Sequence, residues 1–110
     1  MKSLYIAGPI EGVKNYRERF AAAQSVAEGY EWAVLNPAAL PAGLAKEAYM
    51  PICLAMLNAA DAVLMLDGWV ESEGAKIERG FALYQGKQVY KQSYFGADIP
   101  KVIRERRADT

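Results

Sequence analysis

The chain has 110 residues, of which 53% are hydrophobic and 24% charged, so it can bury a core and is expected to form a single domain over residues 1–110. Its 13 basic residues balance 13 acidic ones, which leaves no basic surface for clamping DNA. Histidine is absent, which excludes Ser-His-Asp and Cys-His nucleophile systems and histidine-based metal sites. We expect neither a metal nor a cofactor.

The lone cysteine, Cys53, cannot form a disulfide within the chain, and this favours a reducing, cytoplasmic location. We interpret Cys53 as a buried small hydrophobe. The first apolar run, in MKSLYIAG, stops at Gly8-Pro9, too early for a signal peptide or a membrane span. We therefore expect a soluble cytoplasmic protein with no membrane partner.

The first third of the chain predicts a strand, a helix and a second strand. Residues 3–7 form a short apolar run that indicates a buried strand. Residues 14–28 are expected to form a helix that ends at Gly29. The apolar positions that form one face of this helix are Tyr16, Phe20, Ala23 and Ala27. Residues 31–35 predict a second short strand.

The middle of the chain predicts a loop, a helix and a central strand. Residues 37–50 contain two prolines and a glycine and are expected to be a loop with at most one helical turn. Pro51 suits the first position of a helix that runs to Ala60, because its missing N–H would be unpaired there. Residues 62–66 are all apolar, which indicates a strand that is covered on both faces.

The last third predicts a helix, a strand and a terminal helix. Residues 75–85 are expected to be helical. The buried stripe of this helix is predicted to hold Ile77, Phe81 and Tyr84. Gly80 lies inside the helix, where it costs about 1 kcal/mol against alanine, and this suggests a close approach by another element or a ligand. Residues 88–90 predict a fourth strand, and residues 99–107 a polar helix.

Strands and helices alternate along the chain, which predicts an α/β fold with a parallel sheet wrapped by helices. In such folds ligands bind beyond the carboxyl ends of the strands. Functional residues are therefore expected in three loops, at residues 8–12, 36–50 and 67–74.

The first of these loops has two glycines, which let a ligand approach the backbone, and its amides near a helix start favour anions or hydroxyls. The loop matches neither the dinucleotide-binding glycine pattern nor the P-loop. An ordinary strand-to-helix turn would also need glycine, so both interpretations stay open. The candidate binding residues are Gly8, Pro9, Ile10, Glu11 and Gly12.

The third loop and the helix after it hold the richest set of candidates. Glu78 lies one turn into the helix, where its side chain points back toward the strand ends and the helix dipole favours the ionised form that a nucleophile needs. A solvated helix carboxylate is the alternative. Ser72 could cap the helix or donate to a substrate oxygen. The other candidate binding residues are Asp67, Gly68, Trp69 and Gly74.

Three segments, YIAGPIEG, LNAADAVLMLDGW and ESEGAKIERGFA, together resemble the nucleoside 2-deoxyribosyltransferase-like superfamily. The resemblance runs from Leu4 to about Tyr90. Its most specific part is the spacing Ser72-x-Gly74-x-x-x-Glu78-x-Gly80-x-Ala82. The chain is most similar to a small branch met in phage and bacterial genomes, and it also resembles the 2'-deoxynucleoside 5'-monophosphate N-hydrolases.

The resemblance implies a flavodoxin-like three-layer sandwich with a parallel sheet of roughly four or five strands. It implies that Glu78 attacks the anomeric carbon of the sugar, that Tyr5 and the first glycine loop hold the nucleoside, and that Ser72 contacts the sugar or a phosphate. It also implies a homodimer or a larger homo-oligomer.

Two positions depart from the superfamily pattern. Glu11 stands where the monophosphate hydrolases have an arginine, and a carboxylate there would repel a phosphate. Cys53 stands where family enzymes place an aspartate that holds the sugar hydroxyls, and a thiol is a poor substitute for a bidentate acceptor.

We therefore expect an enzyme that cleaves or exchanges the N-glycosidic bond of a nucleoside or nucleotide, with Glu78 as the nucleophile and Tyr5 orienting it or the sugar. The acid for the departing base would be Asp67, Glu11 or Glu71. One alternative is a nucleotide or nucleotide-sugar binding module without turnover, which the two departures would explain. Another is an interaction protein, whose candidate interface residues are Trp69, Tyr90, Tyr94 and Phe95.

Overall fold

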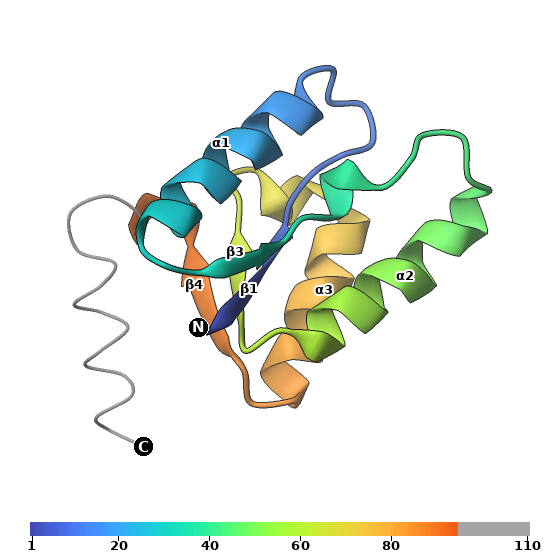
Figure 1. Cartoon of the computed structure of the whole chain (residues 1–110). Coiled ribbons are helices and arrows are strands. Elements are labelled where there is room, and N and C mark those ends of the chain that lie inside the picture. The colour runs from blue at the N-terminus through green and yellow to red at the C-terminus, as the bar shows by residue number, and fades with distance from the viewer. Residues whose placement is uncertain (95–110) are drawn as a thin grey trace.

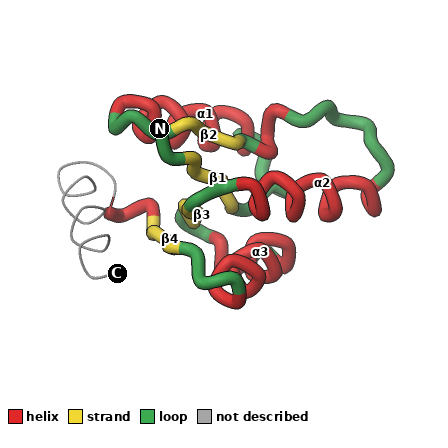
Figure 2. Tube along the Cα trace, turned by 60° about the horizontal axis from the view of Figure 1, so that its bottom comes forward, coloured by secondary structure: helices red, strands yellow, loops and turns green. Residues whose placement is uncertain are grey.

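The computed structural model describes residues 1–94, which form a four-stranded parallel sheet between two layers of helices (Figure 1, Figure 2). In the spatial order β2-β1-β3-β4, the strands are β1 (Ser3–Ala7), β2 (Ala33–Leu35), β3 (Ala62–Met65) and β4 (Gln88–Lys91). One face is covered by α1 (Tyr16–Gly29), and the other by α2 (Lys46–Ala59) and α3 (Glu73–Tyr84). This order and layering match the predicted flavodoxin-like three-layer sandwich.

The central strands β1 and β3 end together at one edge of the sheet. Leu4 pairs with Ala62 and Ala7 with Met65, and Met65 in turn pairs with Lys91 of β4. Both central strands are almost entirely apolar and buried, as strands covered on both faces must be. The loops that follow β1 and β3 therefore leave from the same edge, which we call the carboxyl edge.

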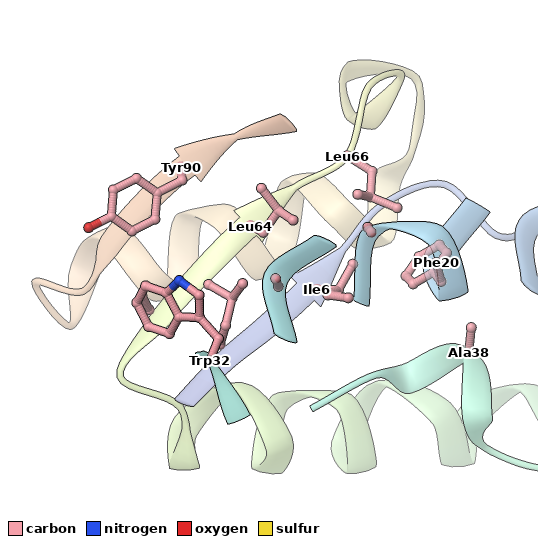
Figure 3. Packing of buried hydrophobic residues seen from close by; sticks show 11 residues of the cluster. Ile6, Phe20, Trp32, Ala38, Leu64, Leu66 and Tyr90 are labelled. Atoms are coloured by element: carbon pink, nitrogen blue, oxygen red, sulfur yellow. The ribbon is translucent and has the colours of Figure 1, made fainter. Parts of the chain in front are cut away.

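The core beneath α1 confirms the predicted face of that helix (Figure 3). Phe20, Ala23 and Ala27 are buried there against β1 and β3. Trp32 and Tyr90 meet edge to face, with ring centroids 6.4 Å apart. Tyr90 is thus a core residue, and its predicted role at an interface is wrong. The side chain of Tyr94 and residue Phe95 lie outside the described part of the chain.

The second core lies between the sheet and the α2–α3 layer. Its buried residues are Tyr5, Ala7, Cys53, Leu57, Ala60, Val63, Met65, Ala75 and Ala82. The interpretation of Cys53 as a buried small residue is confirmed. Small residues on α3 let this helix lie close to the sheet.

Among the element boundaries that differ from the sequence prediction, the starts of α2 and β2 have physical causes in the structure. α2 begins at Lys46 rather than Pro51, so Pro51 lies inside the helix. The proline removes only the hydrogen bond to the carbonyl of Glu47, an exposed residue, so water can satisfy that carbonyl. β2 begins at Ala33 because the preceding turn places Glu31 at a φ of 69°, which no strand residue adopts.

The buried face of α3 also differs from the prediction. Ala75, Glu78 and Ala82 face the interior, whereas Ile77 and Tyr84 are 53% and 91% exposed. Phe81 alone of the predicted stripe packs partly against the core. Of the two predicted reasons for Gly80, the close approach of another element is absent from the described chain, because a Cβ added there would meet no atom within 4 Å. The helix therefore turns its small residues and one carboxylate inward, and its larger apolar residues outward.

No helix within residues 1–94 is long and apolar enough to cross a membrane. The predicted terminal helix at residues 99–107 lies outside the described residues.

Candidate active site

The three candidate loops meet at the carboxyl edge of the sheet. Gly68 lies so close to Pro9 that a Cβ built on the glycine would be 3.4 Å from the proline ring. This approach brings the first loop next to the third. Gly74 lies similarly close to Met50, because a Cβ built on the glycine would be 3.5 Å from the Met50 methyl. This approach brings α2 next to the third loop. The exposed Glu11 carboxylate lies 3.7 Å from the Lys46 ammonium, which bridges the first loop and the start of α2. The expected convergence of these loops is therefore observed.

Beneath these loops, Tyr5 and Glu78 form a buried pair. Tyr5 lies in the middle of β1 and is fully buried on the α2–α3 face, and Glu78 projects from the inner face of α3 and is 6% exposed. The Tyr5 hydroxyl donates a hydrogen bond to Glu78 Oε2. Glu78 is the one charged side chain buried within residues 1–94, so the interpretation of it as a solvated carboxylate is wrong.

Burial dominates the electrostatics of this pair. Desolvation raises the pKa of the Glu78 carboxyl from 4.5 to about 7, although the hydrogen bond from Tyr5 acts in the opposite direction. Burial and the neighbouring Glu78 charge raise the pKa of the Tyr5 phenol far above its ordinary value. Tyr5 therefore stays protonated and acts as a fixed hydrogen-bond donor, while Glu78 changes its charge near neutral pH.

Cys53 of α2 lies against the same pair. It belongs to the same buried cluster as Tyr5. Burial raises the pKa of the Cys53 thiol, the hydrogen bond with the Tyr5 side chain opposes that rise, and the nearby Glu78 charge adds to it. The thiol thus stays neutral. Cys53 therefore brings no charge to the site, although the resemblance places a sugar-binding carboxylate at its position.

Ser72 caps the helix that carries Glu78. Its hydroxyl oxygen accepts a hydrogen bond from the Ala75 N–H at 3.2 Å, and its backbone is extended, as an N-cap requires. The proton of the same hydroxyl can still be donated to another oxygen. Of the two roles considered for Ser72, the capping role is therefore observed, and it is compatible with the other.

The backbone of Asp67 is held from two sides by residues that the sequence prediction did not include. Arg19 of α1 donates to the Asp67 carbonyl at 2.7 Å, and the Asp67 N–H donates to the Gln92 side chain at 2.8 Å. Gly68 follows with a φ of 88°, a conformation that favours glycine. These contacts fix the loop between β3 and α3. No sequence motif indicates them, because the three partners are far apart in the chain.

Trp69 is half-buried rather than exposed, which differs from the expected interface position. Its ring packs against the core cluster, and the Arg79 guanidinium lies 4.8 Å from the ring centroid. This cation–π contact links the third loop to the middle of α3.

The residues of the first loop have different environments. Gly8 is buried, and a Cβ there would lie 2.8 Å from Leu66 Cβ, so packing against Leu66, the residue that follows β3, requires glycine at this position. Gly12 has a φ of 79° with open space around it, and Ile10 packs partly against the α1 core. Glu11 is fully at the surface with Lys46, so its charge is partly balanced there.

No group of three or more potential metal-binding side chains occurs within the described part of the chain. The fold and site together define a flavodoxin-like α/β domain whose buried carboxylate–phenol pair lies below the carboxyl edge of a parallel sheet. The chain belongs to the family described as Domain of unknown function (DUF4406), which matches residues 2–91. No curated protein and no solved structure matches the chain.

Proposed function

We propose that the protein cleaves or exchanges the N-glycosidic bond of a nucleoside or nucleotide, with Glu78 as the nucleophile. The observation that carries this proposal is the buried Glu78 carboxyl, which Tyr5 holds in place and whose pKa of about 7 keeps it partly ionised at neutral pH. A buried carboxylate that keeps few hydrogen bonds is both reactive and able to stabilise a neighbouring positive charge.

In the proposed first step, a Glu78 oxygen forms a bond to the anomeric carbon while the bond from that carbon to the base nitrogen breaks. The electron pair of the broken bond leaves on the base, which takes a proton from an acid. The sugar passes through an oxocarbenium-like state that the carboxylate stabilises by charge. In the second step, water or another base attacks the same carbon while the bond from that carbon to the Glu78 oxygen breaks. The proton of the attacking group passes to the carboxylate that served as the acid in the first step. Water as the attacking group gives a hydrolase, and a base gives a transferase.

The donor of the proton to the base remains one of three surface carboxyl groups. Asp67, Glu11 and Glu71 are all exposed in loops at the carboxyl edge or next to it. Tyr5 is unsuited to this role, because burial raises the pKa of its phenol and its proton is already donated to Glu78.

Base release from a panel of nucleosides, nucleoside 5'-monophosphates and NAD, followed by chromatography, tests this proposal. Wild type should release a base from at least one compound, and Glu78→Gln should lower the rate by at least about a thousandfold. Glu73→Gln is the matched control, because Glu73 is an exposed carboxylate on the same helix. A Glu78→Gln protein that retains the wild-type rate would refute the proposed nucleophile.

Binding without turnover is a second candidate, which the neutral Cys53 thiol beside the pair and the low exposure of Glu78 favour. A binding module should show a higher melting temperature with a nucleotide or nucleotide sugar while releasing no base on long incubation. Cys53→Asp distinguishes the two candidates further, because a gain of base release in this variant would indicate that the thiol limits catalysis.

A further inference from the structure

Glu78 is covered too fully for a substrate to reach it directly. Its side chain is 6% exposed and its partner Tyr5 is fully buried, so the carbon of a sugar can approach the carboxylate only after a covering group moves aside. The sheet closes one side of the pair, and α2 and α3, which contact each other, close the opposite side. The path to Glu78 therefore runs from the carboxyl edge, between the first turns of the two helices.

Met50 lies on that path. Both helices begin at the carboxyl edge, so their side chains point back toward it. Met50 precedes the buried Cys53 by one turn of α2, and Gly74 precedes Glu78 by one turn of α3, on the same helix face. Because the Met50 methyl would lie 3.5 Å from a Cβ built on Gly74, it spans the gap between the helices directly above the Glu78 carboxylate.

Met50 can move without disturbing the fold, unlike its neighbours around the site. Trp69 packs against the core and is held by Arg79, and Cys53 is buried. Met50 is only half-buried and does not belong to the packed core beneath it. Its side chain is unbranched and has three rotatable bonds, and Gly74 has no side chain that would hinder its rotation. Rotation of one methionine side chain is therefore the least costly way to uncover Glu78.

We propose that Met50 is the gate of the site, a side chain that covers Glu78, swings aside when a substrate enters from the carboxyl edge and then packs against the sugar. The thioether offers an apolar contact, which suits the C–H face of a sugar ring. The closed position keeps water from the carboxylate, and the open position admits the reacting carbon. The inference rests on the proposed function for the identity of the substrate, whereas the cover over Glu78 does not depend on that function.

The pKa of the Glu78 carboxyl measures the cover without any substrate. NMR titration of the full chain with ¹³C-labelled glutamate carboxyl groups gives this pKa, and Glu78→Gln assigns the signal. The pKa should be about 7 in wild type. Met50→Ala admits water and should lower it by at least about one pH unit, toward the ordinary value of 4.5. A change of neighbouring charge would not explain this shift, because Tyr5 and Cys53 stay protonated.

Two further variants separate the cover from its movement. Met56→Ala is the matched control, because Met56 lies on the same helix, further from the carboxyl edge, and packs against the core. It should leave the pKa of Glu78 near 7. Met50→Ile keeps an apolar side chain of similar size, but its branched Cβ restricts rotation. This variant should keep the pKa near 7 and lower kcat/KM for base release by at least about fivefold.

The outcomes distinguish the gate from the proposed function. A Glu78 pKa that stays near 7 in Met50→Ala, or that falls equally in Met56→Ala, would overturn the gate whatever the activity of the protein. Wild-type kcat/KM in Met50→Ile would overturn it as well. If the pKa falls only in Met50→Ala while no compound of the panel loses its base, the cover is supported and the proposed function alone is refuted.

Discussion

Replacing Glu78 with glutamine should remove a loss of stability that the wild type undergoes as the pH rises toward neutral. The buried carboxyl has a pKa of about 7 when folded and 4.5 ordinarily, so between these values the folded state holds a proton that the unfolded state has lost. The contribution of Glu78 to stability is therefore fully present below pH 4.5 and is lost as the pH rises to about 7. A shift of this size corresponds to a loss of about 3 kcal/mol.

The glutamine side chain carries no charge, so this loss should be absent from the Glu78→Gln variant. The free energy of unfolding of the variant, relative to wild type, should rise by about 2–3 kcal/mol between about pH 5 and about pH 8. Comparing the change with pH removes any constant effect of the amide on packing. Urea unfolding at the two pH values measures it, with an expected relative shift of roughly 1–2 M in the midpoint.

Glu73→Gln is the control, because Glu73 is exposed on the same helix and should show no such divergence. If wild type and Glu78→Gln differ by the same free energy at both pH values, Glu78 does not have a raised pKa in the folded protein. The reasoning from burial would then be refuted, and with it the account of a carboxylate that is partly protonated at neutral pH.

Three further changes test other parts of the structure. Tyr5→Phe removes the hydrogen bond that lowers the pKa of Glu78, so the rising limb of the pH–rate profile should shift to higher pH by about one pH unit. A limb at the wild-type pH would contradict this expectation. Gly8→Ala should lower the free energy of unfolding in urea by about 1–3 kcal/mol, because the alanine Cβ would lie 2.8 Å from Leu66 Cβ. Gly74→Ala should lower it less, because the Cβ there would lie 3.5 Å from the Met50 methyl. Equal losses in the two variants would argue against this packing. Glu31→Gly should stabilise the protein by about 0.5–1 kcal/mol, because Glu31 has a φ of 69°; a loss of stability would show that the side chain matters more than the strain.

The sequence alone predicted the order of the elements and the layers. The apolar runs of β1 and β3 indicated buried strands, and the spacing of Phe20, Ala23 and Ala27 identified the inner face of α1. These predictions succeed because the two strands are apolar on both faces, whereas the apolar residues of α1 lie on one face only. The resemblance to a known superfamily also selected Tyr5 and Glu78, which the structure brings into contact.

The orientation of α3 was decided only by the tertiary structure. Its sequence offers two faces, one with Ile77 and Tyr84 and one with Ala75, Glu78 and Ala82, and hydrophobicity favours the first. Packing selects the second, because alanines allow the helix to lie close to the sheet and the Tyr5 hydroxyl supplies a partner for the buried carboxylate. Helix periodicity shows which residues share a face, whereas the choice of the buried face depends on the shape and polarity of the surface that meets it.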